Sequence, residues 1–196
     1  QGDRTQQQLN QYALNVIKKK LETIDGVGEV RLGGRRDRTI RVTTEGTRFL
    51  LSTNIDAPNY KVIAIDLSKP EKENWTVVIP ETENVLSAGS GGGKLFAEYL
   101  IDAKSAVKQF DFNGKLERDI ELPGIGSAAG FGAKKKDKDF YYSFTSFTSP
   151  STIYHYDIAT GKSTFYRQPK VDFNPEDYET KQIFYQSKDG TKVPMF

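Results

Sequence analysis

Short runs rich in aromatic and aliphatic residues, separated by polar turns, fill the chain from about residue 47 onward. Residues 48–53, 95–101 and 140–147 form three such runs, and their length and aromatic or β-branched content are typical of strands. Asn113-Gly114 and Thr160-Gly161 stand between runs as turn dipeptides. This part of the chain is therefore predicted to be mainly β.

A block of roughly 45 residues recurs three times within this β-rich part. Its clearest marks are an aspartate between two apolar or aromatic residues (Φ-Asp-Φ): Ile65-Asp66-Leu67, Phe110-Asp111-Phe112 and Tyr156-Asp157-Ile158, with aspartates 45 and 46 positions apart. Each mark precedes a strand that ends at or near a proline, Pro80, Pro123 or Pro169. A period of about 40–50 residues with about four strands per repeat is typical of β-propeller blades.

The fourth strand of each repeat is expected just before the next one begins. Residues 84–88, 125–131 and 181–186 would each supply an inner strand for the following blade. A β-sandwich also strings short strands together, but the three-fold recurrence favours the propeller. Three repeats cannot close a ring of the usual four to eight blades, so the fold class expected is an incomplete β-propeller of about three blades, an open arc or a curved solenoid.

Residues 1–43 follow a different pattern. Seven apolar residues fall at helical spacing and form one stripe: Leu9, Tyr12, Ala13, Val16, Ile17, Leu21 and Ile24. Gly26 and Gly28 indicate the end of that helix, and residues 30–32 and 39–42 alternate as in a hairpin. We therefore expect a small α/β helix–hairpin element over residues 1–43 and a partial propeller over residues 44–196.

Composition narrows the classes of function. The chain has 28 basic and 26 acidic residues, a net charge of +2, which offers no general attraction for nucleic acid. It has no cysteine, which excludes disulfides and thiolate metal sites. No apolar run approaches the roughly 18 residues that span a bilayer. The composition leaves the compartment open, periplasmic or cytoplasmic.

One glycine-rich stretch and two serines invite a catalytic or nucleotide-binding interpretation. The stretch Gly89-Ser90-Gly91-Gly92-Gly93-Lys94 resembles a P-loop, but Ala88 takes the place of the motif's first glycine and Leu95 that of its hydroxyl residue. We expect an inter-strand loop there. The nucleophile elbow G-x-S-x-G needs a glycine two positions before the serine, but Ala88 stands there for Ser90 and Ile125 for Ser127.

Charged residues and the one histidine give no catalytic pattern. His155 is expected as a strand histidine between aromatic residues rather than a triad member. Residues 134–139 (KKKDKD) and 35–38 (RRDR) are interpreted as solvated turns, and Glu71, Glu73, Glu81 and Glu83 show no paired placement. The sequence thus predicts no catalytic, cofactor-binding or metal-ligating residue, and no cofactor.

From about residue 46 to 196 the chain resembles the prolyl oligopeptidase family. The resemblance lies in residues 53–60 (TNIDAPNY), 70–75 (PEKENW), 144–150 (FTSFTSP) and 182–196 (QIFYQSKDGTKVPMF). It implies a serine endopeptidase that cuts short peptides after proline, with a Ser-Asp-His triad in an α/β-hydrolase domain that a seven-bladed propeller covers. This chain would supply late blades up to the entry of that domain, with no counterpart of the triad.

Residues 5–43 resemble the porter region of resistance–nodulation–division efflux pumps. The similar segments are residues 11–17 (QYALNVI), 26–30 (GVGEV) and 33–42 (GGRRDRTIRV). The resemblance implies a chimera joined near residues 42–46. Three hypotheses follow: a non-catalytic gating fragment of a peptidase, a protein- or peptide-binding module that also self-associates through open blade edges, and a piece of an efflux transporter.

Overall fold

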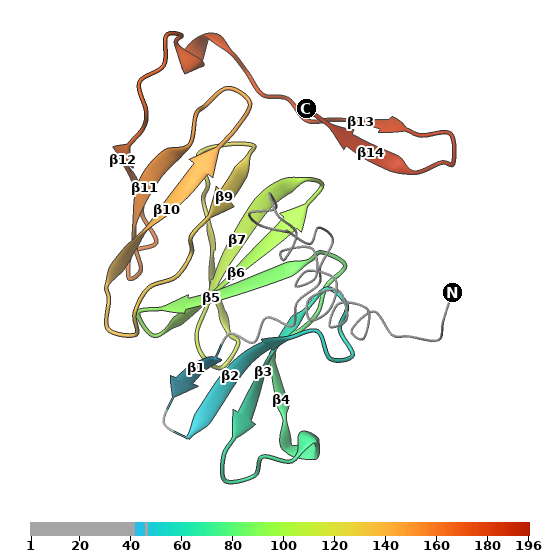
Figure 1. The fold of residues 1–196 in the computed structure, drawn as a ribbon, viewed down its shortest axis with the longest axis vertical. Helices are drawn as coiled ribbons and strands as arrows, with labels where there is room; N and C mark the ends of the chain where they lie inside the picture. The colour runs from blue at the N-terminus through green and yellow to red at the C-terminus, as the bar shows by residue number, and fades with distance from the viewer. Residues whose placement is uncertain (1–41, 46) are drawn as a thin grey trace, which may run out of the picture. The chain divides into compact units, whose positions relative to one another are not determined.

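The computed structural model describes residues 42–45 and 47–196, so the predicted helix–hairpin element lies outside the described residues. Ile40–Phe196 form one compact unit. It contains three antiparallel sheets of four strands each and one two-stranded ribbon (Figure 1). None of these described sheets closes on itself. The expectation of a mainly β fold with three repeats is confirmed.

Each four-stranded sheet holds four strands that are consecutive in the chain, and each strand pairs with its neighbours in sequence. Sheet 1 contains β1 (Val42–Glu45), β2 (Arg48–Thr53), β3 (Lys61–Asp66) and β4 (Thr76–Ile79). Sheet 2 contains β5 (Leu86–Gly91), β6 (Lys94–Ile101), β7 (Lys104–Phe110) and β8 (Leu116–Ile120). Sheet 3 contains β9 (Ser127–Ala129), β10 (Asp139–Thr145), β11 (Thr152–Asp157) and β12 (Ser163–Arg167). Two 3-10 turns, η2 (Lys72–Asn74) and η3 (Pro175–Asp177), lie in the connections.

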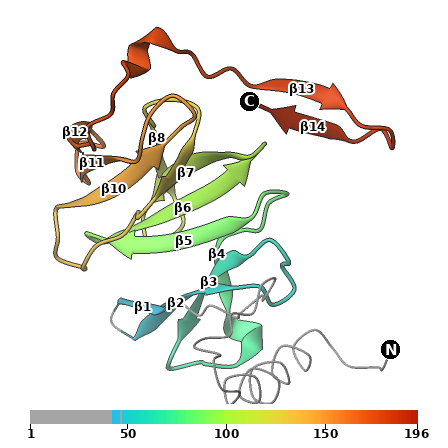
Figure 2. The ribbon, with the colours of Figure 1, turned by 45° about the horizontal axis from the view of Figure 1, so that its top comes forward.

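Two of the three predicted inner strands take the expected place, as β5 and β9. The third prediction, residues 181–186, is wrong. There β13 (Ile183–Gln186) pairs only with β14 (Lys192–Met195) (Figure 2). The short turn closes locally, since Ser187 N donates to Thr191 O and Gly190 N to Ser187 O, and a local hairpin costs little loop entropy.

The first sheet begins slightly before the predicted boundary at residue 44. Val42 and Thr43 stand opposite Leu51 and Leu50 in the register of β1 and β2. Backbone pairing therefore extends the first repeat by two residues into the segment that was grouped with the N-terminal element.

The aspartate of every Φ-Asp-Φ mark caps the turn between the third and fourth strands of its sheet. In each case Oδ1 accepts hydrogen bonds from groups a few residues on: Ser68 N and Oγ for Asp66, Asn113 N and Lys115 N for Asp111, and Thr160 N and Oγ1 for Asp157. The backbone donors Ser68 and Thr160 are the main cause of the lowered pKa of Asp66 and Asp157. The repeat mark is therefore a turn requirement.

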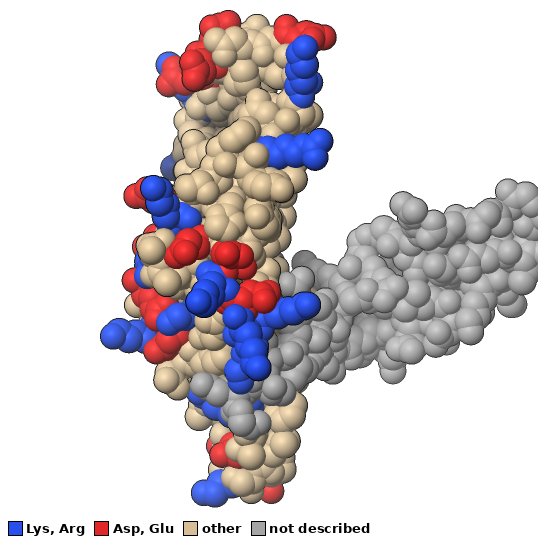
Figure 3. Space-filling model, turned by 90° about the vertical axis from the view of Figure 1, so that its left-hand side faces the viewer, with Lys and Arg blue, Asp and Glu red and all other residues tan. Residues whose placement is uncertain are grey.

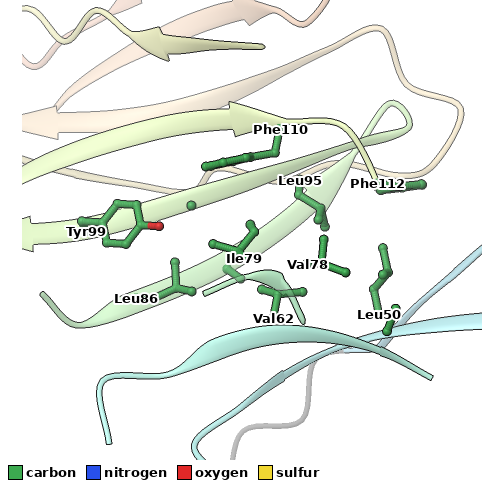
Figure 4. Close-up of a cluster of buried hydrophobic side chains, with 12 residues drawn as sticks. Leu50, Val62, Val78, Ile79, Leu86, Leu95, Tyr99, Phe110 and Phe112 are labelled. Atoms are coloured by element: carbon green, nitrogen blue, oxygen red, sulfur yellow. The ribbon is translucent and has the colours of Figure 1, made fainter. Parts of the chain in front are cut away.

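Two apolar cores hold the three sheets together. Between sheets 1 and 2 (Figure 4) the buried residues are Leu50, Val62, Ala64, Val78, Ile79, Leu86, Ala88, Leu95, Ala97, Tyr99, Phe110 and Phe112. Between sheets 2 and 3 they are Phe96, Val107, Ile120, Phe131, Phe140, Tyr142, Phe144, Tyr156 and Ile158. Because strand side chains alternate between faces, sheet 2 contributes one face to each core.

The glycine-rich stretch is strand rather than loop, which corrects the expectation for residues 89–94. Gly89 and Gly91 lie within β5, and only Gly92-Gly93, with φ of 57° and 75°, make the turn to β6. A Cβ on Gly89 would lie 1.9 Å from Phe131 O. The glycines are needed because the segment around residues 131–133 packs directly on the backbone of β5.

Candidate functional site

The only histidine lies on β11 beside an acidic and an aromatic side chain. Its Nε2 is 3.4 Å from Asp139 Oδ2, and its ring centroid is 5.1 Å from that of Tyr141. Ser90 and Ser127 lie on other strands, β5 and β9. The described contacts of His155 therefore give it a carboxylate and a ring as partners, without a serine hydroxyl for nucleophilic catalysis.

The lysine-rich tract is a closed turn. Lys134 N donates to Asp137 Oδ2 at 2.8 Å, and Asp137 N donates back to Lys134 O at 3.1 Å. Figure 3 shows basic and acidic side chains interspersed over the middle of one face of the described part. Glu81 is also structural, because its Oε1 accepts a hydrogen bond from Asn59 N. The tract at residues 35–38 lies outside the described residues.

A buried polar network crosses the junction between sheets 2 and 3. Tyr156 Oη donates to Gln109 Oε1 at 2.7 Å, and both residues have no exposed surface. The amide of Gln109 donates to Ile158 O at 3.2 Å and to Glu117 Oε2 at 2.9 Å. Glu117 in turn forms an ion pair with Lys94 at the edge of the junction. The network satisfies groups that an apolar junction would leave unpaired.

Ionisation in this network follows from burial and from hydrogen bonds. Burial raises the pKa of Tyr156 to about 12, against a smaller opposing effect of Arg118, so its hydroxyl stays a donor throughout the neutral range. Desolvation acts to raise the pKa of Glu117, but hydrogen bonds from Gln109 and Lys94 outweigh it and lower the pKa overall. These groups are arranged for stability rather than for proton transfer.

An arginine of the preceding sheet makes a polar contact at each junction, from β2 at the first and from β8 at the second. Arg48 Nη1 donates to Phe112 O at 3.1 Å, and Arg118 Nη2 donates to Ala159 O at 3.0 Å. In both cases an arginine of one sheet donates to a backbone carbonyl one or two residues after the aspartate of the next sheet's Φ-Asp-Φ mark. A Cβ on Gly161 would lie 2.2 Å from Arg118 Nη1, which shows how closely this turn approaches the preceding sheet.

A cavity of about 370 Å³ lies between sheets 1 and 2 and the segment at residues 131–133. It is lined by Leu50, Ser52, Val62, Ala88, Gly89, Ser90, Leu95, Phe131, Gly132 and Ala133. None of these lining residues is ionisable, so the cavity offers apolar contact and hydroxyl or backbone hydrogen bonds but no acid or base.

Within the described residues, no group of three or more His, Cys, Asp or Glu side chains is placed to hold a metal ion. The part of the chain that the structure describes also has no helix long and apolar enough to cross a membrane. The absence of catalytic, cofactor-binding and metal-ligating residues stays a prediction for the chain as a whole.

The residues that join the sheets carry no clear signal in the sequence. Gln109, Arg48 and Arg118 are ordinary polar residues in short strands, and each acts on a segment between 41 and 64 positions away in the chain. The one usable signal was a glutamine at a position of β7 that the strand alternation would bury.

Comparison with known proteins assigns the fold to a family. Residues 27–169 match the family model of the prolyl oligopeptidase N-terminal β-propeller domain. A prolyl endopeptidase of Elizabethkingia meningoseptica is 50% identical over 152 residues, which cover 78% of this chain and 22% of that protein. A prolyl endopeptidase of Dictyostelium discoideum is 34% identical over 166 residues, again 22% of its length.

Solved structures agree. One prolyl endopeptidase structure, 41% identical, superposes with a TM-score of 0.71 over 79% of this chain and 23% of its own. Prolyl oligopeptidase B of Galerina marginata, 29% identical, also gives a TM-score of 0.71 over 85% of this chain and 26% of its own. The chain thus spans about a fifth to a quarter of these relatives. It belongs to the prolyl oligopeptidase family and represents a part of that family's β-propeller domain.

Proposed function

We propose that residues 44–196 are a non-catalytic, substrate-gating part of a prolyl-oligopeptidase-like serine endopeptidase. The match of residues 27–169 to the propeller domain carries this proposal. The geometry supports it, because the buried Gln109 network joins sheets 2 and 3.

The partners proposed for the whole protein are an α/β-hydrolase catalytic domain and short peptides that contain proline. The β13–β14 ribbon supports the first of these. It exposes Ile183, Phe184, Tyr185 and Met195, and a two-stranded hairpin with such apolar surface needs further packing to be stable in water.

Two assays test the proposal. The isolated chain should neither turn over a proline-containing chromogenic peptide nor react with a covalent serine-hydrolase probe, and labelling of any serine would refute it. For the gate, residues 46–169 replace the corresponding segment of the Elizabethkingia meningoseptica enzyme. A folded chimera should still cleave a short peptide and spare a long unfolded protein, and loss of that size selectivity would contradict a gating role.

A second candidate function is a binding module that uses the open sheets at either end of the arc. The observation in its favour is the exposed apolar surface on sheets 1 and 3, including Leu67, Val77, Tyr141 and Tyr166. Exposed sheet surfaces of this kind favour protein contacts. Light scattering separates the two functions, since a strictly monomeric chain without partners would remove this candidate.

The efflux-pump and chimera hypothesis concerns residues 5–43 alone and rests on their sequence pattern. It predicts co-purification with a membrane complex. If the chain expressed in its host brings down no membrane protein, this third candidate is lost while the propeller assignment stands.

A further inference from the structure

Asn113-Gly114 is the only Asn-Gly pair in the sequence, and a pair of this kind can modify itself. A glycine nitrogen has no side chain beside it to hinder attack, so once it has lost its proton it attacks Cγ of the preceding asparagine. The N–Cγ bond forms, the Cγ–Nδ2 bond breaks, and the amide nitrogen leaves as ammonia with that proton. Water then opens the cyclic imide to an aspartate or an isoaspartate.

The folded turn holds both groups that would react. Gly114 N donates to Asp111 O at 3.1 Å, which retains the proton that has to leave. Asn113 Oδ1 accepts a hydrogen bond from Arg48 Nη1 at 3.0 Å, and Asn113 N donates to Asp111 Oδ1 at 2.8 Å. Because ring closure needs a deprotonated nitrogen and a side chain free to approach it, the closed turn opposes the reaction even though Asn113 is exposed.

Part of this hold comes from another sheet. Arg48 belongs to β2 of sheet 1, and its Nη1 donates both to Asn113 Oδ1 and to Phe112 O in the turn of sheet 2. Gly114 also lies against sheet 1, because a Cβ placed on it would be 2.1 Å from Val78 O. A separation of sheets 1 and 2 would therefore release the amide of Asn113 and the backbone of Gly114 together.

We propose that Asn113 is a deamidation site controlled by the junction between sheets 1 and 2, which protects the amide while it is closed and lets it react when it opens. Folded proteins open locally in this way. Where reclosing is faster than the chemistry, the observed rate is the rate in the open chain multiplied by the fraction of open molecules. The extent of deamidation at Asn113 therefore measures how often this junction opens, whether or not the chain acts as a gate.

The two products differ in what they do to the junction. An aspartate at position 113 keeps the backbone unchanged and offers Arg48 a carboxylate in place of the amide oxygen, so the junction can close again on an ion pair. An isoaspartate adds a methylene group to the backbone within the turn. Asp111 Oδ1 binds the backbone N–H groups of Asn113 and Lys115, each at 2.8 Å, and a lengthened backbone cannot keep both. The isoaspartate form thus weakens the junction permanently.

The test is incubation of the purified 196-residue chain at mildly alkaline pH, followed by proteolysis and mass spectrometry that separates peptides with asparagine, aspartate and isoaspartate at position 113. The same chain unfolded in guanidinium chloride gives the reference rate. We expect the folded chain to react at least about tenfold more slowly than the unfolded one, which corresponds to an opening free energy of about 1.4 kcal/mol or more.

Arg48→Ala should raise the deamidation rate of the folded chain about tenfold, because two hydrogen bonds from a charged donor are lost, and should leave the rate of the unfolded chain unchanged. Arg118→Ala is the matched control. Arg118 Nη2 donates to Ala159 O across the other junction, between sheets 2 and 3, so its loss should not change the rate at Asn113. Arg48→Lys keeps the charge without the planar donor group; it should give an intermediate rate, and it replaces Arg48→Ala if that variant does not fold.

Three results would overturn the proposal. The first is a folded chain that deamidates as fast as the unfolded one. The second is a wild-type rate in the folded Arg48 variant. The third is equal acceleration by Arg118→Ala, which would assign the protection to the stability of the whole chain. Circular dichroism before incubation shows whether each variant folds, and the peptidase and probe assays decide the proposed function separately.

Discussion

Replacing Tyr156 by phenylalanine tests whether the junction between sheets 2 and 3 depends on its buried hydrogen bonds. The change removes only the hydroxyl that donates to Gln109 Oε1 at 2.7 Å and keeps the ring in its core. Because neither residue has exposed surface, water cannot replace the lost donor, and the amide oxygen is left unsatisfied. A buried acceptor without a partner costs about 1–3 kcal/mol.

The matched control is Tyr142→Phe. Tyr142 is equally buried as a ring, at 1% exposure, but its hydroxyl donates at 3.0 Å to Ser163 Oγ, which is half-buried. In the variant, the Ser163 hydroxyl can form a hydrogen bond with water instead. Removing the Tyr142 hydroxyl should therefore cost only about 0.5–1.5 kcal/mol, the net contribution of an ordinary hydrogen bond. The two variants thus remove the same tyrosine hydroxyl, once from a fully buried partner and once from a half-buried one.

Urea unfolding of the chain measures both variants. We expect Tyr156→Phe to be the more destabilised, with an unchanged denaturant slope, since the folded surface stays the same. Combining Tyr156→Phe with Gln109→Leu should cost less than the sum of the single changes, by about 0.5–3 kcal/mol. Equal losses for Tyr156 and Tyr142, or strict additivity in the double variant, would refute the reasoning.

Three other changes follow from the geometry. In thermal unfolding, Gly114→Ala should destabilise the chain much more than Gly93→Ala. Both glycines have positive φ, but only at Gly114 would a Cβ meet a backbone atom, Val78 O at 2.1 Å. Equal losses of thermal stability in the two variants would contradict this. The pKa of Glu117 in the folded chain lies below its ordinary value of 4.5, so its ionised form stabilises the fold above that value, and this stabilisation is lost as the pH falls through the folded pKa. In urea unfolding at a series of pH values, Glu117→Gln should therefore lose less stability on acidification than the unchanged chain. Identical pH profiles of the two chains would disprove this. Gln182→Ala should raise hydrogen exchange in residues 178–196, because Gln182 holds the β6–β7 turn through hydrogen bonds to Asp102 O and from Lys104 Nζ; unchanged exchange would show that other contacts suffice.

The sequence predicted the elements that local chemistry determines. The Φ-Asp-Φ marks located three turns correctly, because an aspartate caps its own turn within four residues. The same repeat spacing also predicted two of the three inner strands correctly, β5 and β9. The prediction failed for residues 181–186, where β13 pairs with the neighbouring strand β14 in a local hairpin. It also failed for Gly89–Gly91, where the need for glycine comes from the distant Phe131 and Ala133.

The residues that join the sheets could not be found in the same way, because their role depends on long-range placement. Strand alternation puts Gln109 on the same face of β7 as the apolar Val107, but it does not identify the partner of Gln109, because Ile158 is 49 positions away in the chain. Strand alternation assigns a side chain to a face, but which face another sheet covers is a tertiary property. The repeat could therefore be predicted from local turn chemistry, whereas the residues that join the sheets could be identified only from the packing of the sheets.

In each repeat, one residue caps the turn, and in the second and third repeats the next residue, the anchor, packs against the preceding sheet. Because these two roles fall on different residues, one position can stay constant while the other varies. The aspartate is constant because the turn needs it, while the residue after it differs: Leu67, Phe112 and Ile158. The residue of the preceding sheet that meets the anchor changes with it. The larger Phe112 shares its core with Ala64, and the smaller Ile158 lies against Gln109, the register equivalent of Ala64. A close-packed junction has to conserve total volume, so each anchor fits its own preceding sheet better than another's.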